Sequence, residues 1–454
     1  MYKVVVIGAG ITGLTCAYQL RRKGVDVLVL EQQDRVGGQI NSVRDGEFSF
    51  ESGPNTGVIK YPEVVELFEQ LGGSCQLETA QASSKCRLIW KGDRFHPLPS
   101  GLGSAISTPL FTWHDKLRIL GEPWRRRGTD PDESVGSLAE RRLGKSFVDY
   151  AVDPFLSGVY AGDPYRLPTR WALPKLYALE QDYGSFVRGS IAKAKLPKSE
   201  RDRKATKQVF SAQGGFSALV NALAEGIGRE RLVTSAQHIT VLPDGQAGWN
   251  VSYESPAGPV TVQAAHVVTT CGAYSLPELL PFVSADVMAD MSYLYYAPVV
   301  QVGVGIRDCG GVQWRAFGGL VPSREHRDML GILFPSACFQ GRAPEQGAAM
   351  AYFIGGARHP ERLDMSDAQL HDLVNRSLHE MLGYPAGKVA DAVRIFRHQR
   401  AIPQYDVRTP ARLAAIERVE RQFPTLTIAG NLRDGIGMGD RIKQACDVAS
   451  RIAQ

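Results

Sequence analysis

The first thirty residues alternate between apolar runs and one amphipathic stretch. An apolar run over 2–7 precedes a stretch in which Leu14, Ala17 and Tyr18 share one face at helical spacing, and a second apolar run covers 25–30. The amphipathic stretch ends in three basic residues, 21–23, followed by Gly24, as helices commonly end. The pattern therefore predicts a strand, a helix and a second strand, the opening unit of a parallel α/β sheet.

The rest of the chain divides into a helical part and later strand-rich parts. Helices are predicted at 62–72 and at 132–150, the second behind Asp132-Glu133-Ser134, and 99–204 is mainly helical. The charge-dense stretch 193–207 is interpreted as a solvated loop or linker, with a patch that binds a membrane or an acidic partner as the alternative. After a strand end, a Gly214-Gly215 turn and a helix within 209–227, strands are predicted at 232–233, 239–242, 249–253, 260–262, 265–270, 293–306, 316–334, 348–355 and 426–429. A turn at 430–439 and a helix from about residue 440 close this α/β, or overall α+β, fold.

The turn after the first predicted strand reads Gly8-Ala9-Gly10-Ile11-Thr12-Gly13. In a dinucleotide fingerprint the first glycine permits the tight turn, the second lets the backbone approach a pyrophosphate, and the third lets helix and strand pack closely. The N–H groups at the helix N-terminus then face the phosphates. Glu31 ends the second predicted strand, where a carboxylate accepts from ribose hydroxyls and repels the 2′-phosphate of NADP. The unit predicts a dinucleotide site that disfavours NADP.

A second glycine-rich turn, residues 431–440, also leads from a strand into a helix. Its backbone N–H groups and helix dipole suit the N1/C2-carbonyl edge of FAD, which gains negative charge on reduction. No second GxGxxG stands between a strand and a helix, since Gly303-Val304-Gly305 lies inside a predicted strand. We therefore expect non-covalent FAD without a nicotinamide site. The reduced flavin would pass its electrons to oxygen, a quinone or another acceptor.

Composition excludes several other classes of protein. The net charge is only +5, and no nucleic-acid-binding signature occurs, so no nucleic-acid partner is expected. The seven cysteines form no CxxC pair and the nine histidines no HExxH, which indicates a reduced compartment and no metal site. No apolar run reaches the ~18 residues that a spanning helix needs. We expect a cytoplasmic protein, with peripheral contact at the inner face of the membrane and a homodimer both left open.

Longer strings carry a resemblance to a known family. They are Arg35–Gly38, Glu51–Asn55, Pro154–Pro164, Gln213–Phe216, Phe317–Ser323, Ala401–Tyr405 and Gly430–Asp440. On these strings the chain resembles the protoporphyrinogen oxidase family of FAD enzymes, nearly end to end. The resemblance implies a Rossmann-type FAD-binding domain assembled from 1–84, 205–275 and 415–454. It also implies a mixed-sheet substrate domain from 85–98 and 276–414, and a mainly helical insertion at 99–204 that could face a membrane.

The resemblance also assigns site residues. The cofactor contacts fall on Gly8, Ala9, Gly10, Ile11, Thr12, Gly13, Glu31, Gln32, Gly38, Gly53, Pro54, Asn55, Thr56, Ile239, Ile436, Gly437 and Met438, with Ile239 contacting the adenine side through its backbone. Arg87 would bind a propionate carboxylate, Phe317 would pack on a tetrapyrrole ring, and a side chain at Gly162 would crowd the ligand. From the residues alone, Arg87 is better explained as a surface arginine on a strand, and Phe317 and Gly162 also fit a core aromatic and a turn glycine. No catalytic residue and no metal ligand are assigned.

The chain departs from related patterns at two positions. Arg441 stands where relatives often carry Cys, and Gln39 follows the double glycine where amine oxidases often carry Arg. The first departure changes little in the interpretation. The second argues against an amine oxidase.

The implied activity is oxidation of protoporphyrinogen IX to protoporphyrin IX in haem biosynthesis. It would remove six electrons in three flavin cycles, each reoxidised by O2 with release of peroxide. Hydride would leave a methylene-bridge carbon for flavin N5 while pyrrole N–H groups lose protons, so catalysis lies in positioning and needs no strong side-chain base. Coproporphyrinogen III, with four carboxylates instead of two, is the alternative substrate. A flavin amine oxidase, a carotenoid desaturase and a non-catalytic flavoprotein are more distant alternatives.

Overall fold

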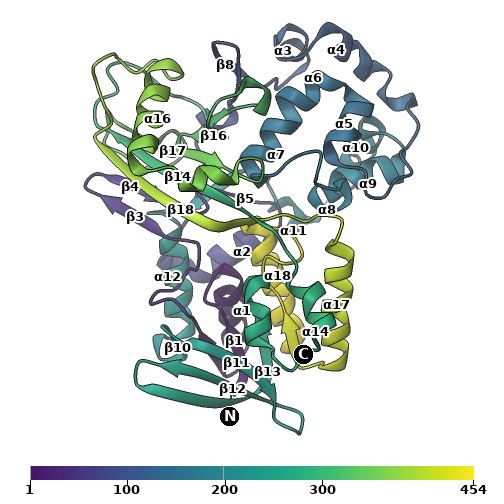
Figure 1. Ribbon diagram of the computed structural model, residues 1–454, viewed down its shortest axis with the longest axis vertical. Coiled ribbons are helices and arrows are strands. Elements are labelled where there is room, and N and C mark those ends of the chain that lie inside the picture. Colours follow the sequence, from purple (N-terminus) through teal and green to yellow (C-terminus); the bar gives the residue numbers. More distant parts are fainter. Residues whose placement is uncertain (1, 198) are drawn as a thin grey trace.

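Two seven-stranded sheets and a helical segment form most of the described part of the protein, together with a two-stranded and a three-stranded sheet. The computed structural model describes residues 2–197 and 199–454. The first sheet lies at the end of the molecule that holds the N-terminus, and the second lies at the other end beside the helical segment (Figure 1). The predicted combination of a parallel α/β unit, a mixed sheet and a helical part is confirmed.

The first sheet has the order β10-β2-β1-β13-β12-β11, with β19 paired to the end of β13. Its parallel pairs are β10–β2, β2–β1, β1–β13 and β13–β19. These strands are β1 (Tyr2–Ile7), β2 (Val27–Leu30), β10 (Leu232–Val233), β13 (Gly258–Thr269) and β19 (Leu426–Ile428). Strands β11 (Gln237–Pro243) and β12 (Trp249–Ser255) join β13 in an antiparallel meander. The strands predicted at 260–262 and 265–270 are therefore one continuous strand.

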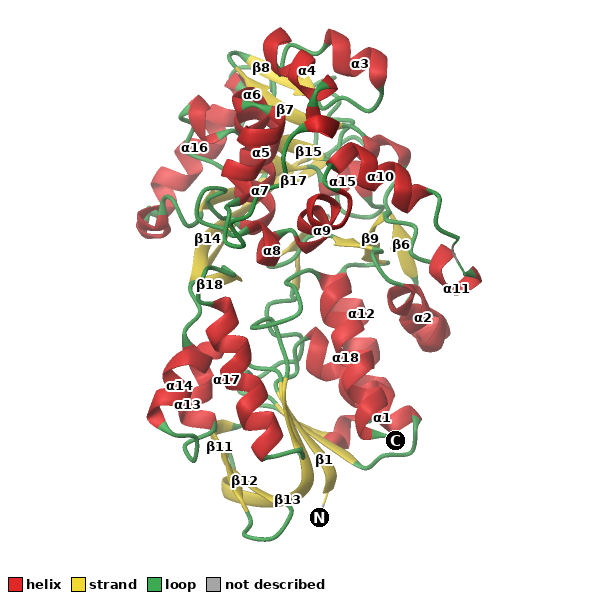
Figure 2. Ribbon diagram, turned by 90° about the vertical axis from the view of Figure 1, so that its right-hand side faces the viewer, coloured by secondary structure: helices red, strands yellow, loops and turns green. Residues whose placement is uncertain are grey.

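Helices cover both faces of the first sheet (Figure 2). Val4 and Val6 of β1 pack towards α1 (Ile11–Arg22), α12 (Phe216–Ile227) and α18 (Met438–Ile452). Val5 and Ile7 pack on the opposite face, in the cluster that holds α13 (Leu276–Leu279), α14 (Ala285–Ser292) and α17 (Thr409–Gln422). Successive side chains of a strand point to opposite faces of the sheet, so the fully buried strand β1 contributes to two hydrophobic clusters. Helices α13 and α14, which the predicted division assigns to the substrate domain, pack on this sheet; the division itself stays a prediction.

The second sheet has the order β18-β14-β17-β16-β15-β7-β8. Its strands are β7 (Arg87–Lys91), β8 (Arg94–Pro97), β14 (Tyr296–Ile306), β15 (Gly318–Leu320), β16 (Gly331–Leu333), β17 (Ala348–Gly355) and β18 (Ala392–Pro403). Gly303 and Gly305 of β14 lie against the rings of Phe50 and Phe48, so a Cβ at either would be within 3 Å of a ring atom. These rings belong to the hairpin of β3 (Ser42–Asp45) and β4 (Phe48–Glu51), which joins the N-terminal segment to the second sheet.

The remaining elements connect these layers. A small sheet of β5 (Gly57–Val58), β9 (Val209–Ala212) and β6 (Leu77–Thr79) lies beside α2 (Pro62–Leu71), and α15 (Pro335–Cys338) and α16 (Asp367–Glu380) accompany the second sheet. The helical segment contains α3 (Leu102–Ser107), α4 (Trp113–Leu120), the 3₁₀ turn η3 (Glu122–Trp124), α5 (Val135–Leu143), α6 (Lys145–Phe147), α7 (Asp153–Tyr160), α8 (Thr169–Ala172), α9 (Pro174–Tyr183), α10 (Phe186–Ala194) and α11 (Glu200–Arg203). Across the described residues, every helix is too short or too polar to cross a membrane.

The single helix predicted over 132–150 is wrong. Ser134 caps the helix start as expected, but the helix ends at Leu143 because Gly144 has a φ of +101°. A Cβ at Gly144 would also meet the carboxylate of Asp115, which accepts from the N–H and Oγ of Ser146. A short helix and a π-helical turn at 148–152 follow. The break follows from the glycine that ends the helix, and the packing of Asp115 against that glycine adds to it.

The prediction of a solvated loop over 193–207 is wrong in two places: α10 extends to Ala194, and α11 covers 200–203. Ser199 and Asp202 form a capping box at the start of α11. Arg201 pairs with Glu66 at 2.7 Å, and Lys204 pairs with Glu69 at 2.6 Å. The dense charge on this stretch therefore faces the acidic side of α2, although half or more of the Arg201 side chain is exposed.

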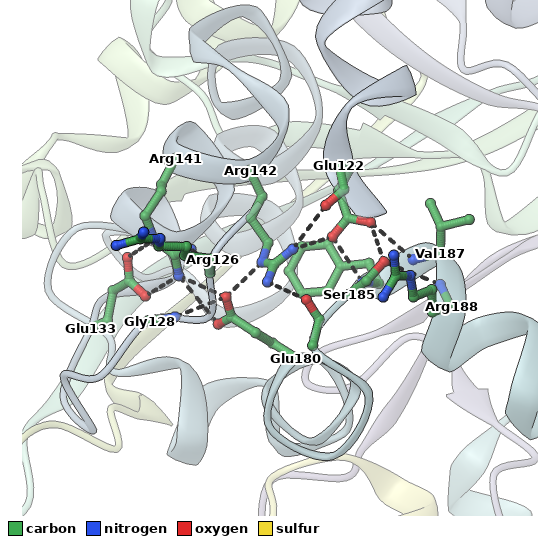
Figure 3. Close-up of polar contacts among 12 residues, drawn as sticks. Glu122, Arg126, Gly128, Glu133, Arg141, Arg142, Glu180, Ser185, Val187 and Arg188 are labelled. Carbon is green, nitrogen blue, oxygen red and sulfur yellow. Dashed lines mark hydrogen bonds and ion pairs between the residues drawn. The ribbon is translucent and has the colours of Figure 1, made fainter. Parts of the chain in front are cut away.

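A buried ionic network holds the helical segment together (Figure 3). Arg142 of α5 is fully buried; its Nε donates to Glu180 Oε1 at 2.6 Å, and its Nη1 is paired with Glu122. Glu122 also accepts from Ser185 Oγ at 2.5 Å and from the N–H of Phe186 at 2.9 Å. The network joins α5, η3, α9 and α10, and its carboxylate oxygens are fully used, as buried charges require.

Candidate functional site

The first glycine turn has the geometry that a dinucleotide needs. Gly8 has a φ of +100°, and a Cβ at Gly13 would lie 1.9 Å from the carbonyl oxygen of Gly8. A Cβ at Gly10, in contrast, would meet nothing within 4 Å. Gly8 and Gly13 are therefore required by the fold itself, while the space beside Gly10 is left open, as the approach of a pyrophosphate requires.

The start of α1 is suited to an anion. Gly10 is its N-cap, no side chain caps it, and its first turn contains no acidic residue. The orphan N–H groups and the positive end of the helix dipole are thus not satisfied by side chains of the chain itself. This arrangement fits the phosphates of FAD.

Glu31 lies next to this turn at the end of β2. It is 8% exposed, and its carboxylate accepts from the N–H of Ala9 at 2.7 Å and from the N–H of Gln33 at 2.9 Å. Residues 233–237 run alongside, with Gln237 Nε2 donating to the carbonyl oxygen of Gln32 at 2.8 Å. The carboxylate is therefore held where the ribose of a dinucleotide would pass.

Ile239 lies on β11 beside this segment. The pairing of β11 with β12 shifts register between Gln237 and Thr240, and His238 has a φ of +49°. This bulge takes Ile239 out of the regular ladder, which leaves its backbone less committed to the sheet. A backbone contact from Ile239 to the adenine side stays a prediction.

Two further loops close around the glycine turn. Gly38 has a φ of +60°, and its Cβ position lies 3.3 Å from the Cα of Gly10. Gly53 packs on Gln39 so closely that a Cβ would lie 2.0 Å from the Gln39 carbonyl oxygen, and Pro54, Asn55 and Thr56 follow it. The two loops are thus in contact with each other and, through Gly38, with the fingerprint.

The second sheet is tied to these loops by β18, a strand that the sequence did not reveal. Gln39 Nε2 donates to the carbonyl oxygen of Arg400 at 3.0 Å, and His398 Nε2 lies 2.6 Å from the carbonyl oxygen of Ser52. Most positions of β18 are only half-buried, and its polar residues are grouped at 394 and 397–400, so it lacks the alternation of a predicted strand. The sequence feature that could have pointed to this strand is the string Ala401–Tyr405 at its end, which also carries the family resemblance.

The C-terminal glycine turn leads into α18, which begins at Met438, two residues before the predicted start. Gly435 has a φ of +97°, and the N–H of Gly437 donates to Asp440 Oδ2 at 3.1 Å. Asp440 is paired with Lys60 at 3.2 Å, next to the loop of Gly53–Thr56. The structure thus places Ile436, Gly437 and Met438 at a helix N-terminus that contacts Lys60, four residues after Thr56.

Three side chains that were not predicted as site residues anchor this turn. Tyr405 Oη donates to the carbonyl oxygens of Asn431 at 2.8 Å and Gly435 at 3.2 Å. Arg412 Nε donates to the carbonyl oxygen of Leu432 at 3.1 Å, and Arg441 Nη2 to that of Arg433 at 2.7 Å. For Arg441 the departure from the family pattern was the available signal.

Arg87 and Phe317, the first two predicted substrate residues, lie together at the second sheet. Arg87 of β7 is exposed, and its guanidinium carbon lies 5.6 Å from the centre of the Phe317 ring. Phe317 immediately precedes β15, which pairs with β7. The pair offers a guanidinium with free donors next to an aromatic face, which suits a carboxylate on a flat apolar ring system.

Gly162 lies elsewhere, on the loop after α7. A Cβ there would come within 2.6 Å of Gln404 Oε1 and 2.7 Å of Leu167 Cδ1. Gln404 Nε2 donates to the carbonyl oxygen of Tyr160 at 2.7 Å, so it fastens this loop to the end of β18. A side chain at 162 would thus have to displace Gln404 or Leu167, whether or not a ligand lies beside it.

Two tyrosines near the turn do not act as bases at neutral pH, because the pKa of each is raised. Burial raises the pKa of Tyr405 to about 12, partly offset by the charges of Arg441 and Arg412. Burial likewise raises the pKa of Tyr160 to about 12. Both tyrosines stay protonated and donate hydrogen bonds. No cluster of potential metal ligands occurs among the residues described.

Comparisons with known proteins agree with this geometry. The flavin containing amine oxidoreductase family matches residues 11–453. The chain is 30% identical to the chloroplastic protoporphyrinogen oxidase of Nicotiana tabacum, over 99% of this chain and 85% of that one. It is 29% identical to the protoporphyrinogen oxidase of Homo sapiens, over 98% and 97%. A crystal structure of a protein from Exiguobacterium sp. 255-15 has a TM-score of 0.81 at 23% identity, over 100% and 98%, and so shares the fold.

Proposed function

Because the chain belongs to the flavin containing amine oxidoreductase family, we propose that it is the FAD-dependent oxidase that converts protoporphyrinogen IX to protoporphyrin IX. The observation that carries this proposal is the similarity to curated protoporphyrinogen oxidases of plants and mammals along nearly the whole of both chains. FAD and oxidoreductase activity come with the family. The substrate, and O2 as the electron acceptor, are proposed.

The proposed cofactor site runs from the first sheet to the second. The fingerprint residues 8–13 would hold the pyrophosphate, Glu31 and Gln32 the ribose, and Ile239 the adenine side. Gly38 and residues 53–56 would line the middle of the cofactor, and residues 436–438 would face the flavin ring. FAD bound in this way supplies the hydride acceptor.

The chain's own contribution is to bind and orient the substrate. Arg87 would bind a propionate carboxylate by charge-assisted hydrogen bonds while Phe317 packs on the ring system. The loop of Gly162, held by Gln404, would bound the site on another side. Because the substrate's own pyrrole nitrogens lose their protons, positioning is sufficient and a general base is not required.

Anaerobic flavin reduction tests the proposed substrate. We expect protoporphyrinogen IX to bleach the flavin absorbance of the holoprotein, and readmitted oxygen to restore it with formation of peroxide. Coproporphyrinogen III and an alkyl amine are measured in parallel. Faster bleaching by coproporphyrinogen III would favour the alternative substrate, and bleaching only by the amine would favour an amine oxidase. If none of the three bleaches the flavin, the proposed function is wrong.

Replacing Arg87 by alanine tests the proposed carboxylate contact. A lost charge-assisted hydrogen bond of about 1.5–3 kcal/mol should raise KM roughly 10- to 100-fold, with a much smaller fall in kcat. Arg94→Ala is the matched control, because Arg94 is an exposed arginine on the neighbouring strand β8. Steady-state kinetics on the porphyrinogen that reduces the flavin give both constants. An unchanged KM would remove Arg87 from the site.

We further propose that the helical segment contacts an anionic membrane surface. Trp113, Leu117, Leu120 and Trp124 are each more than 60% exposed and follow one another at intervals of four, three and four residues along α4 and η3. Such spacing places the three residues of α4 on one side of the helix, and Trp124 follows in η3. An exposed apolar stripe of this kind is typical of an interaction surface rather than of a solvated one.

The charges around this stripe favour anionic lipid as the partner. Between residues 113 and 127 the only acidic residues, Asp115 and Glu122, are buried and hydrogen-bonded. The exposed charged residues of the same stretch include two basic ones, Arg126 and Arg127. Aromatic and aliphatic side chains with basic neighbours are the pattern of a helix that lies in the plane of a membrane interface.

Vesicle sedimentation tests this surface. We expect the protein to sediment with phosphatidylglycerol-containing vesicles more than with pure phosphatidylcholine vesicles. The double variant Leu117→Ser/Leu120→Ser should bind at least about tenfold more weakly, since each leucine contributes roughly 1.5–3 kcal/mol when buried. Val389→Ser, at an equally exposed apolar residue outside the helical segment, is the control. Equal binding by all three proteins would contradict the proposal.

A further inference from the structure

Two almost completely buried arginines donate hydrogen bonds to the C-terminal glycine turn. Arg412 is 1% exposed and Arg441 is 5% exposed. They come from different helices, α17 and α18, yet both direct their guanidinium groups to backbone carbonyl oxygens of residues 430–433. The residues 436–438 that follow are those proposed to face the flavin ring.

Neither arginine has a carboxylate partner within ion-pair distance in the described part of the chain. The hydrogen bonds of Arg412 go to the carbonyl oxygens of Leu432 and Tyr293 and to Thr409 Oγ1 at 3.2 Å. Those of Arg441 go to two carbonyl oxygens and to Gln444 Oε1 at 2.7 Å. The Nε–H of Arg441 is buried without any hydrogen-bond partner in the structure.

The nearby carboxylates are already paired with other cations. Glu420 pairs with Arg433 at 3.0 Å, and Asp434 with Arg433 at 3.4 Å. Asp440 is paired with Lys60. The turn therefore carries two positive charges that the surrounding side chains do not neutralise by direct ion pairs.

This arrangement is unfavourable for the protein by itself. Burying a charge without a partner is costly, and a cation at the N-terminal end of a helix is opposed by the helix dipole. Burial accordingly lowers the pKa of both Arg412 and Arg441, although an arginine stays protonated at any physiological pH. A stable counter-charge is expected where such a pair persists, and the ligand proposed for this turn is the one group that gains negative charge during the reaction.

We propose that Arg412 and Arg441 are positioning residues of the flavin site that stabilise the reduced cofactor through the turn 430–437 and so raise its reduction potential. The inference rests on the proposed placement of FAD at this turn, but not on the identity of the substrate. Buried charges act through a medium of low effective dielectric constant, so they need not touch the cofactor. Their hydrogen bonds also hold the turn rigid, which keeps its N–H groups oriented.

The test is the reduction potential of the holoprotein, measured by slow anaerobic reduction against a reference dye. At a fixed dye potential, we expect Arg441→Gln to lower the reduced-to-oxidised flavin ratio at least tenfold, equivalent to about 30 mV for a two-electron couple. Arg412→Gln should lower it in the same direction. Arg441→Lys, which retains the charge, should retain most of the wild-type ratio.

Tyr405→Phe separates charge from anchoring. It removes the hydroxyl that holds the same turn through Asn431 and Gly435 but changes no charge, so we expect a much smaller change in the ratio. An equal change in Tyr405→Phe and Arg441→Gln, or none in either glutamine variant that binds FAD, would overturn the inference. Failure of the wild-type protein to bind FAD would instead overturn the proposed cofactor site. Failure of porphyrinogens to reduce the flavin would leave this measurement intact.

Discussion

Replacing Arg142 by methionine is expected to lower the free energy of unfolding by about 3–5 kcal/mol. The substitution keeps the length of the side chain but removes the cation between Glu122 and Glu180, both of which are at most 1% exposed. Glu122 would then lie buried without a cation, and Glu180 would keep only its pair with Arg141 at 2.9 Å. The loss comes mainly from the buried charge of Glu122 that is left uncompensated, rather than from the original attraction.

Chemical denaturation at neutral pH measures this loss. Arg229→Met is the control, because Arg229 forms an exposed i,i+4 pair with Glu225 and should change stability by no more than about 0.5 kcal/mol. If unfolding proceeds in two steps, the destabilisation should appear in the step that includes the helical segment. Equal, small effects of both substitutions would mean that the buried network contributes little.

The pH dependence of the Arg142→Met effect follows from Glu122. Burial by itself raises the pKa of Glu122, but hydrogen bonds from Ser185 and from the N–H groups of Phe186 and Val187, with the charge of Arg142, outweigh it and hold the pKa below its ordinary value. A carboxyl group of this kind contributes stability above its unfolded pKa and loses it as pH falls through the folded pKa. The difference between the two proteins should therefore be full at neutral pH and shrink under acid.

Gly13→Ala is expected to reduce the FAD content of the purified protein below about a tenth of the wild-type value. The added Cβ would lie 1.9 Å from the carbonyl oxygen of Gly8 and 2.9 Å from Thr270 Oγ1. Because the carbonyl group belongs to the backbone, α1 must move away from β1. The helix N-terminus and the turn that would hold the pyrophosphate would then separate.

Flavin absorbance after reconstitution with excess FAD gives the occupancy, and far-ultraviolet circular dichroism reports whether the fold is kept. Gly73→Ala is the matched control, since a Cβ there meets nothing within 4 Å and the position has no positive φ. The control should bind FAD normally. Wild-type affinity in Gly13→Ala would contradict the proposed role of the turn.

The parallel unit at the start of the chain was predictable because its signals are local. Apolar runs of fully buried strands, the glycine spacing and the basic helix end all lie within thirty residues. The strand β18 was not predicted, since its stability comes from pairing along β14 and not from its own alternation. The break at Gly144 was missed although it has a local signal: like Gly24, it is a glycine that follows basic residues in the last turn of a helix.

The candidate site shows the same division. The fingerprint and Glu31 were identified from spacing, and the structure brings them together with the loops of Gly38 and Gly53. Arg87, Phe317 and Gly162 were assigned only by resemblance. The structure brings Arg87 and Phe317 into contact but places Gly162 against Gln404. Their roles toward a substrate stay predictions.

By itself, the sequence determined the dinucleotide unit, because a tight turn, a close helix–strand contact and a helix N-terminus each depend on residues a few positions apart. Only the tertiary structure decided which distant residues surround that unit. Gln39 meets β18, Tyr405 and Arg412 reach the C-terminal turn, and Arg441 is buried without a carboxylate partner. Those relations depend on how the two sheets and their helices pack. Charge pairing and burial are properties of that packing, and the spacing of apolar and polar residues along the chain does not reveal them.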